Sequence, residues 1–295
     1  MSFADRSTPV LIVAAVTPLT PDGDSLDEGA IAPYVEFLES HGADGVFACG
    51  TTGEGVLLSL EERRRVASTY RAAVHGTLIV HAGAQNTRDT SALAAHAAEV
   101  GADAVAVIAP PYFALDDESL TAHFVAAARA CAPLPFYCYA FTARSGYPLP
   151  VDVIRRIGEA VDNPAGLKVS ESPFERVQPY LELGLPVLIG SEPLIPAGLA
   201  GGAIGSVSGM AAAFPDVVRA ALDDPTAAAP DLSALRDALD ARGLAATAKH
   251  VLGMRGVPIS PGMRAPLRGL GPGEAAVLAE ALAEFLPREV SAPAG

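Results

Sequence analysis

Lysine is rare in this sequence, and one lysine stands where a cation is least expected. Only two of the 20 basic Lys and Arg residues are lysines, Lys168 and Lys249, and Lys168 ends the short apolar segment "AGLKV". Burial can depress the pKa of a lysine by roughly 3–5 units, whereas arginine stays charged. Only a neutral amine attacks a carbonyl carbon to form a Schiff base. The segment predicts carbonyl chemistry at Lys168, with an ion pair to an acid or a place at a solvent-exposed rim as the alternative.

Two further segments carry residues that suit the same chemistry. "PFYCYAFTARSG" (135–146) presents Tyr139, which can relay protons, and Arg144, which can clamp a carboxylate through two hydrogen bonds. "CGTTGEG" (49–55) offers Thr51, Thr52 and glycine-flanked amides that can hold a carboxylate. Taken alone, a core aromatic, a surface charge and an ordinary turn would explain these residues equally well.

The elements that must position these groups repeat along the chain. Helical, alanine-rich segments end at a glycine, and a β-branched apolar run follows within a few residues. These runs are continuously apolar, as is typical of parallel strands buried on both faces. Five such runs lie within 40–50, 74–83, 100–110, 183–190 and 200–209, and the apolar runs 10–16, 134–140 and 165–169 bring the expected strands to eight.

Eight strand–helix units predict an α/β fold, a (β/α)₈ barrel over residues 1–223. A doubly wound sheet is the alternative, but no GxGxxG fingerprint follows the first strand. Residues 224–295 are expected to form a C-terminal helical appendage packed on the barrel. The barrel places Lys168 at the carboxyl end of the sixth strand, where such folds carry their active sites.

Helix-capping patterns and charge runs add local expectations. Ser172, Pro173 and Glu175 predict a capped helix directly after the Lys168 strand, and Ser59 with Glu62 predicts a second capping box. The charges of "SLEERRRV" (59–66) are expected to lie on a solvated helix face.

Composition excludes several classes of function. The net charge of −14 argues against nucleic acid and anionic membranes as partners. Three cysteines and six histidines show no metal-binding spacing, so neither a metal nor a disulfide framework is expected. No apolar run is long enough to span a bilayer, and the segment 8–19 lacks the features of a signal peptide. We expect a cytoplasmic protein.

In combination, these segments resemble the dihydrodipicolinate synthase / N-acetylneuraminate lyase family over most of the chain. The resemblance rests on the order and spacing of six elements: "VTPL" (16–19), "GTTGE" (50–54), "YAFTARSG" (139–146), "GLK" (166–168), "GAIGS" (202–206) and "GMRAPL" (262–267). It implies a class I aldolase that needs no metal or organic cofactor. Lys168 would be the Schiff-base nucleophile toward pyruvate or another 2-oxo acid.

The same resemblance implies roles for the neighbouring residues. Tyr139 would be the acid/base, and Thr51 would link it into a proton relay. Thr52 would bind the carboxylate of the 2-oxo acid, and Gly205 and Ser206 would lie close to the substrate. The resemblance also implies a homotetramer built as a dimer of dimers.

The match departs from the family pattern after the fourth strand. A Tyr-Tyr pair is usual there, and its second tyrosine enters the relay of a neighbouring subunit; here Tyr112 is followed by Phe113, which cannot pass a proton. An aromatic loop residue such as Tyr112 suits a subunit contact. Arg144 favours synthase-like condensation with a carboxylated aldehyde, whereas Phe113 argues against it. Aldolases or dehydratases of 2-keto-3-deoxy sugar acids remain an alternative, and a non-catalytic 2-oxo acid sensor is a more distant one.

Overall fold

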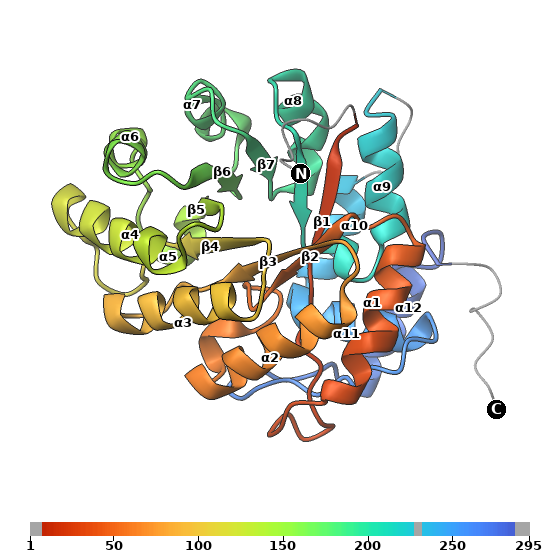
Figure 1. The fold of residues 1–295 in the computed structure, drawn as a ribbon. Helices are drawn as coiled ribbons and strands as arrows, with labels where there is room; N and C mark the ends of the chain where they lie inside the picture. The colour runs from red at the N-terminus through yellow and green to blue at the C-terminus, as the bar shows by residue number, and fades with distance from the viewer. Residues whose placement is uncertain (1–7, 227–231, 287–295) are drawn as a thin grey trace.

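The structure, a computed structural model, describes residues 8–226 and 232–286. Eight parallel strands pair in sequence order and close into a barrel, so the predicted (β/α)₈ architecture is confirmed (Figure 1). The strands are β1 (Val10–Ala14), β2 (Gly45–Ala48), β3 (Thr77–His81), β4 (Ala104–Ile108), β5 (Phe136–Ala140), β6 (Pro164–Val169), β7 (Val187–Ile189) and β8 (Gly205–Ser208).

Helices follow every strand and surround the barrel (Figure 1). They are α1 (Ile31–Ser40), α2 (Leu60–Ala73), α3 (Thr87–Glu99), α4 (Asp117–Cys131), α5 (Thr142–Ser145), α6 (Val151–Ala160), α7 (Gln178–Leu181), α8 (Ile195–Ala200) and α9 (Pro215–Asp223). Short 3₁₀ helices precede several of them, including η4 (Phe174–Arg176) and η5 (Glu192–Leu194).

Two apolar clusters explain why the strands are apolar throughout. Successive strand residues alternate between an inner cluster that fills the barrel and an outer cluster that packs on the helices. On β6, Leu167 and Val169 belong to the outer cluster. The side chain between them, Lys168, therefore points into the barrel.

The capping predictions had different outcomes. Ser59 caps α2, and its hydroxyl accepts a hydrogen bond from the Glu62 amide while Glu62 bonds back to the Ser59 amide, as expected. The capping box predicted at Ser172 and Glu175 is wrong. The chain enters η4 through Pro173, whose ring has no acceptor, and no side chain caps this helix.

Three more helices follow α9: α10 (Leu232–Asp240), α11 (Leu244–Met254) and α12 (Pro272–Ala281). We call residues 232–286 the C-terminal extension; its place directly after α9, which ends at Asp223, matches the expected change from barrel to helices. Residues 227–231 and 287–295 of the predicted appendage lie outside the described residues, and the boundary between 223 and 224 stays a prediction. Among the described helices, none combines the length and the apolar character needed to cross a membrane.

One arginine joins the extension to the barrel. Arg255, at the end of α11, donates from Nη1 to the Ala213 carbonyl (2.6 Å) and forms a two-pronged pair with Asp216 at 2.9 and 2.8 Å. Its guanidinium also lies 4.9 Å from the centre of the Phe37 ring. The Arg255 side chain is almost fully buried, whereas the Asp216 carboxylate keeps part of its surface in water.

Replacement of this arginine should destabilise the fold without touching the carboxyl ends of the strands. Arg255→Met leaves the Ala213 carbonyl and Asp216 without their donor, which should lower the free energy of unfolding by about 2–3 kcal/mol. Unfolding in guanidinium chloride measures the change. A variant as stable as the wild type would show that this contact contributes nothing.

Candidate active site

The Lys168 amine lies in an aromatic setting inside the barrel. The side chain is 4% exposed, and Nζ lies 4.0 Å from the centre of the Phe47 ring and 4.2 Å from that of Tyr139. No hydrogen bond or salt bridge to Nζ occurs within residues 8–226 and 232–286. Burial lowers the pKa of Lys168 to about 7, while the negative charge of Glu192 opposes this shift. The amine is therefore poised to lose its proton near neutral pH.

Tyr139 is the neighbour of Lys168 across the sheet. The two residues are paired in register between β5 and β6, and Tyr139 also points into the barrel. Burial raises the pKa of the Tyr139 hydroxyl, and hydrogen bonds with the Ser170 and Thr51 side chains lower it. The structure thus brings Thr51 to Tyr139, as the sequence led us to expect, and adds Ser170, which the sequence analysis did not name.

The GTTGE loop follows β2 and presents its two threonines differently. Thr52 is buried, whereas Thr51 is exposed. The Thr17 hydroxyl donates to the Gly53 carbonyl at 2.6 Å and holds the loop to the end of β1. A Cβ at Gly55 would lie 1.9 Å from the Cys49 carbonyl oxygen, so only glycine lets the loop close this tightly.

A buried histidine supports the same loop from inside the barrel. His81 Nδ1 lies 3.1 Å from the Cys49 carbonyl, to which it can only donate, and the Ile108 amide donates to Nε2 at 3.4 Å. Burial, assisted by the charges of Arg63 and Lys168, lowers the pKa of His81 to about 3. His81 is therefore neutral and does not add a positive charge beside Lys168.

Arg63 corrects one expectation from the sequence. The run "SLEERRRV" does not lie wholly on a solvated face, because Arg63 is buried. Its guanidinium donates to the carbonyls of His81 (2.6 Å) and Gly83 (2.8 Å) at the end of β3. The carbonyl oxygens solvate the cation, and this three-dimensional arrangement could not be read from a charge run.

Arg144 is exposed on α5, beyond the end of β5. Its guanidinium lies 5.7 Å from the centre of the Phe141 ring, which in turn lies 6.0 Å from that of Tyr139. Buried Glu171 anchors the start of this segment, because its Oε1 accepts from the Thr142 amide (2.7 Å) and hydroxyl (2.9 Å). Arg144 is thus on the Tyr139 side of the barrel mouth and free to meet a ligand from solvent.

Gly205 and Ser206 open β8. Gly205 pairs with Leu188, the residue that also pairs with Lys168, and a Cβ at Gly205 would lie 2.2 Å from the Val10 carbonyl oxygen. The Ser206 hydroxyl is fully buried and donates to the Ile189 carbonyl at 2.7 Å. Gly205 therefore lies on the second strand along from the strand of Lys168. The Ser206 hydroxyl is hydrogen-bonded to a neighbouring strand within the barrel wall.

The sequence analysis missed a buried acid beside the site. Glu192, just after β7, accepts from the Ser208 hydroxyl (2.7 Å), the Met210 amide (2.9 Å) and Arg236 Nη1 (2.6 Å). Its charge acts on the pKa of Lys168. An acid directly after an apolar run predicted as a strand was the available signal. Its partner Arg236 comes from α10, and no local pattern pointed to that contact.

Tyr112 and Phe113 project from the loop after β4. They are 87% and 73% exposed, their rings meet edge to face with centres 4.8 Å apart, and Tyr112 has a left-handed φ of 83°. The two exposed rings form an apolar surface patch, as expected for a contact surface. The subunit contact itself stays a prediction.

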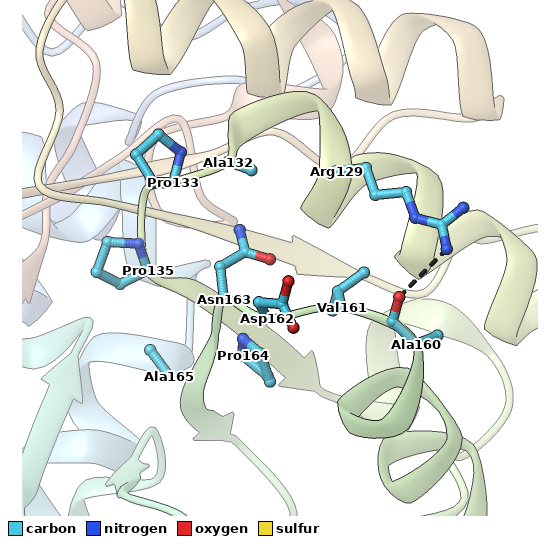
Figure 2. A pocket seen from close by; sticks show the side chains of 10 residues that line it. All are labelled: Arg129, Ala132, Pro133, Pro135, Ala160, Val161, Asp162, Asn163, Pro164 and Ala165. Atoms are coloured by element: carbon cyan, nitrogen blue, oxygen red, sulfur yellow. Dashed lines mark hydrogen bonds between the residues drawn. The ribbon is translucent and has the colours of Figure 1, made fainter.

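A hollow of about 550 Å³ lies at the opposite end of the barrel (Figure 2). Its lining residues lie before β5 and at the start of β6: Arg129, Ala132, Pro133, Pro135 and residues 160–165. Arg129 crosses its edge and donates to the Ala160 carbonyl at 3.2 Å. Because Lys168 and Tyr139 lie toward the carboxyl ends of their strands, this hollow is separate from them.

Comparison with known proteins adds an independent finding. The model of the dihydrodipicolinate synthetase family matches residues 8–284. The chain belongs to this family. It is 35% identical over 278 residues to an uncharacterized DapA-like lyase of Halobacterium salinarum, covering 89% of each chain. It is also 35% identical over 178 residues to N-acetylneuraminate lyase of Rattus norvegicus, covering 58% of this chain and 55% of the relative.

A solved structure agrees with this assignment. It is a prophage protein of the dihydrodipicolinic acid synthase family from E. coli K12 in complex with pyruvate, with a TM-score of 0.86, 25% identity and coverage of 95% of this chain and 99% of the other. Members of the dihydrodipicolinate synthetase family are Schiff-base lyases, and this chain is a class I lyase of that type.

The depressed pKa of Lys168 makes stability depend on pH in a defined window. With a pKa of about 7 when folded and about 10.4 when unfolded, the unfolded chain binds more protons between those values, so stability rises with pH across that window. Lys168→Met has no titrating amine at this position, so its stability lacks this pH dependence. We expect it to be more stable than the wild type at pH 7, with the difference shrinking toward pH 10. Urea unfolding of both proteins from pH 6 to 10 measures this, and parallel curves would refute the depressed pKa.

Proposed function

We propose that Lys168 forms a Schiff base with pyruvate or a related 2-oxo acid and that the protein catalyses aldol condensation or cleavage through it. The observation that carries this proposal is the buried Lys168 amine, held against the Phe47 and Tyr139 rings with a pKa of about 7. At neutral pH a substantial part of it is unprotonated and nucleophilic.

The reaction balances with protein groups alone. The Lys168 amine attacks the C2 carbonyl, Tyr139 donates a proton to the resulting alkoxide, and the nitrogen returns a proton to the Tyr139 phenolate, which gives a neutral carbinolamine. Tyr139 then protonates the carbinolamine hydroxyl, so that water leaves and an iminium ion forms beside the phenolate. The phenolate takes a proton from C3 to give the enamine. The enamine C3 attacks the aldehyde carbon while Tyr139 donates that proton to the aldehyde oxygen, which restores the iminium. Water adds to the iminium, and the product leaves with release of the Lys168 amine. Cleavage is the reverse sequence, and no metal or organic cofactor is required.

Side chains around Lys168 fit the remaining tasks. Thr52 would bind the carboxylate of the 2-oxo acid, and Thr51 would connect Tyr139 to further proton carriers. The hydrogen bonds that act on the Tyr139 hydroxyl support this role, because a proton donor needs a partner that returns the proton. Gly205 and Ser206 would lie close to the bound acid, as the family resemblance implies.

The best-supported second substrate is a carboxylated aldehyde, as in dihydrodipicolinate synthase-like condensation. Arg144 supports it, since an exposed guanidinium on α5 can bind a carboxylate with two hydrogen bonds. A 2-keto-3-deoxy sugar acid is the second candidate. The hydroxyls of Thr51 and Ser170 beside Tyr139 favour it, because such a substrate carries hydroxyls that need partners. Measured turnover of either substrate would exclude the non-catalytic sensor.

A homotetramer is part of the proposal. Tyr112 and Phe113 would pack against a partner subunit and bring Phe113 near the partner's active site. Phe113 cannot pass a proton, so the path from Tyr139 would use Thr51, Ser170 or water. The exposure of both rings supports a contact at this loop.

Trapping the imine tests the proposed nucleophile. Incubation with pyruvate and borohydride should add a reduced pyruvyl mass to the peptide that contains Lys168. Lys168→Arg should abolish labelling and turnover, because arginine does not form the imine. Peptide mass spectrometry reads the site, and the peptide that contains Lys249, the other lysine of the chain, is the internal control that should stay unmodified. A label on Lys249, or none with any 2-oxo acid, would disprove the mechanism.

Replacement of Arg144 tests the second substrate. Arg144→Ala should raise the KM for a carboxylated aldehyde by about tenfold or more, as expected for loss of a charge-assisted hydrogen bond, and should leave imine formation with pyruvate unchanged. Steady-state turnover of pyruvate with a panel of aldehydes, and of 2-keto-3-deoxy acids, measures both. Arg88→Ala, which removes an exposed arginine from α3, is the control. Equal effects on carboxylated and neutral aldehydes would contradict the clamp.

A further inference from the structure

Glu54, the last residue of the GTTGE loop, is held by the C-terminal extension. Lys249 Nζ on α11 lies 2.6 Å from Glu54 Oε1, and neither side chain has any exposed surface. Lys249 also donates to the Gly262 carbonyl at 2.7 Å. The backbone amide of Arg264 donates to Glu54 Oε2 at 2.8 Å, so both carboxylate oxygens are engaged.

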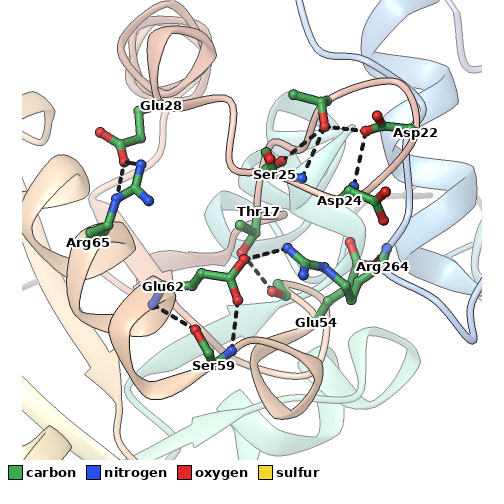
Figure 3. A network of polar contacts seen from close by, with 12 residues as sticks. Thr17, Asp22, Asp24, Ser25, Glu28, Glu54, Ser59, Glu62, Arg65 and Arg264 are labelled. Carbon is green, nitrogen blue, oxygen red and sulfur yellow. Dashed lines mark hydrogen bonds and ion pairs between the residues drawn. The ribbon is translucent and has the colours of Figure 1, made fainter.

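A second contact joins the extension to the helix that follows the loop. The Arg264 side chain pairs with Glu62 at 2.5 Å, and Glu62 Oε2 accepts from the Ser59 amide (Figure 3). Glu54 and Glu62 therefore fasten the two ends of the segment 54–62 to one stretch of the extension. The loop is also held by the Thr17 hydroxyl at the Gly53 carbonyl, by His81 at the Cys49 carbonyl and by the hydrogen bond between the Thr51 and Tyr139 side chains.

The shape of the loop transmits the position of Glu54 to the threonines. Glu54 has a left-handed backbone, with φ of 56°, and its amide donates to the Thr51 carbonyl at 3.1 Å. Thr51 and Thr52 are thus inside the turn that Glu54 closes. A displaced Glu54 carboxylate would shift the turn and both threonines with it.

We infer that Glu54 and Lys249 are positioning residues for the binding of the 2-oxo acid carboxylate, so that the C-terminal extension sets the geometry of the Thr51–Thr52 turn. This inference rests on the proposed function. A buried ion pair contributes little more stability than apolar side chains of similar volume, but it is directional. The hydrogen bonds of Lys249 and Glu54 fix the direction of both side chains, which apolar contacts would not do.

The prediction separates positioning from general stabilisation. The double variant Glu54→Gln/Lys249→Met leaves no unpaired buried charge. It should raise the pyruvate concentration for half-maximal borohydride labelling of Lys168 by about tenfold or more, since misplacement of a binding group by an ångström can cost on the order of 10²-fold. The half-maximal concentration of hydroxyacetone, a neutral ketone without a carboxylate, should stay unchanged, because this ketone makes no carboxylate contact with the turn. The rate of imine formation, which depends on the Thr51 relay, should change alike for both ketones.

The matched control is Arg255→Met, which removes a buried charge from the same extension without contacting the loop. It should label like the wild type with both ketones. The inference would be overturned if the pyruvate concentration for half-maximal labelling did not change in the double variant, or if the half-maximal concentrations of both ketones rose equally.

Two further outcomes keep the test decisive. If the double variant does not fold, Lys249→Arg keeps the charge but places a larger group in a fully buried site, and the same selective loss of pyruvate labelling is expected. An unlabelled wild-type protein would overturn the proposed function and this inference with it. A labelled wild type with unshifted variants would overturn this inference alone.

Discussion

The burial of the Lys168 amine is the constraint on which the rest of the site depends. Lys168 points into the barrel between two aromatic rings, where its positive charge is poorly solvated. Rather than neutralise it with a direct carboxylate, the structure leaves Nζ without a hydrogen-bonded acid among the described residues. The nearby acid, Glu192, gives its oxygens to Ser208, Met210 and Arg236. The result is an amine with a lowered pKa, which Schiff-base chemistry needs.

Burial alone lowers the pKa of Lys168, because no neighbouring cation in the described part of the chain contributes to the shift. His81 is buried and neutral, and both of its ring nitrogens are engaged by the backbone. Arg63, a buried cation, is turned away to the carbonyls of His81 and Gly83. Tyr139 contributes a ring face to the amine and keeps its hydroxyl in contact with Thr51 and Ser170. Burial thus leaves the amine able to lose its proton near neutral pH, and hydroxyls lie beside Tyr139; in the proposed mechanism these are the nucleophile and the route for protons.

Basic residues of the C-terminal extension bind acidic residues of the barrel. Arg236 on α10 reaches Glu192, Lys249 on α11 reaches Glu54, and the segment after α11 reaches Glu62. The first two contacts end just after β7 and β2, and the third ends in the first turn of α2. Both Glu192 and Glu54 are fully buried, so each buried acid depends on a basic partner from the extension. The barrel supplies the reacting groups, and the extension holds the loops around them.

The sequence alone was sufficient for the barrel, because continuously apolar strands are a local pattern that occurs eight times, five times directly after a glycine-ended helix. It also singled out Lys168 and Tyr139 by residue type, and the family by motif spacing. Only the tertiary structure decided which partners meet: Lys249 and Glu54 are 195 positions apart, and no local pattern links Arg236 to Glu192. It also overturned the capping box at Ser172 and the solvated face at Arg63. Local propensity can be read along the chain, whereas burial and charge pairing depend on which strands and helices become neighbours when the barrel closes.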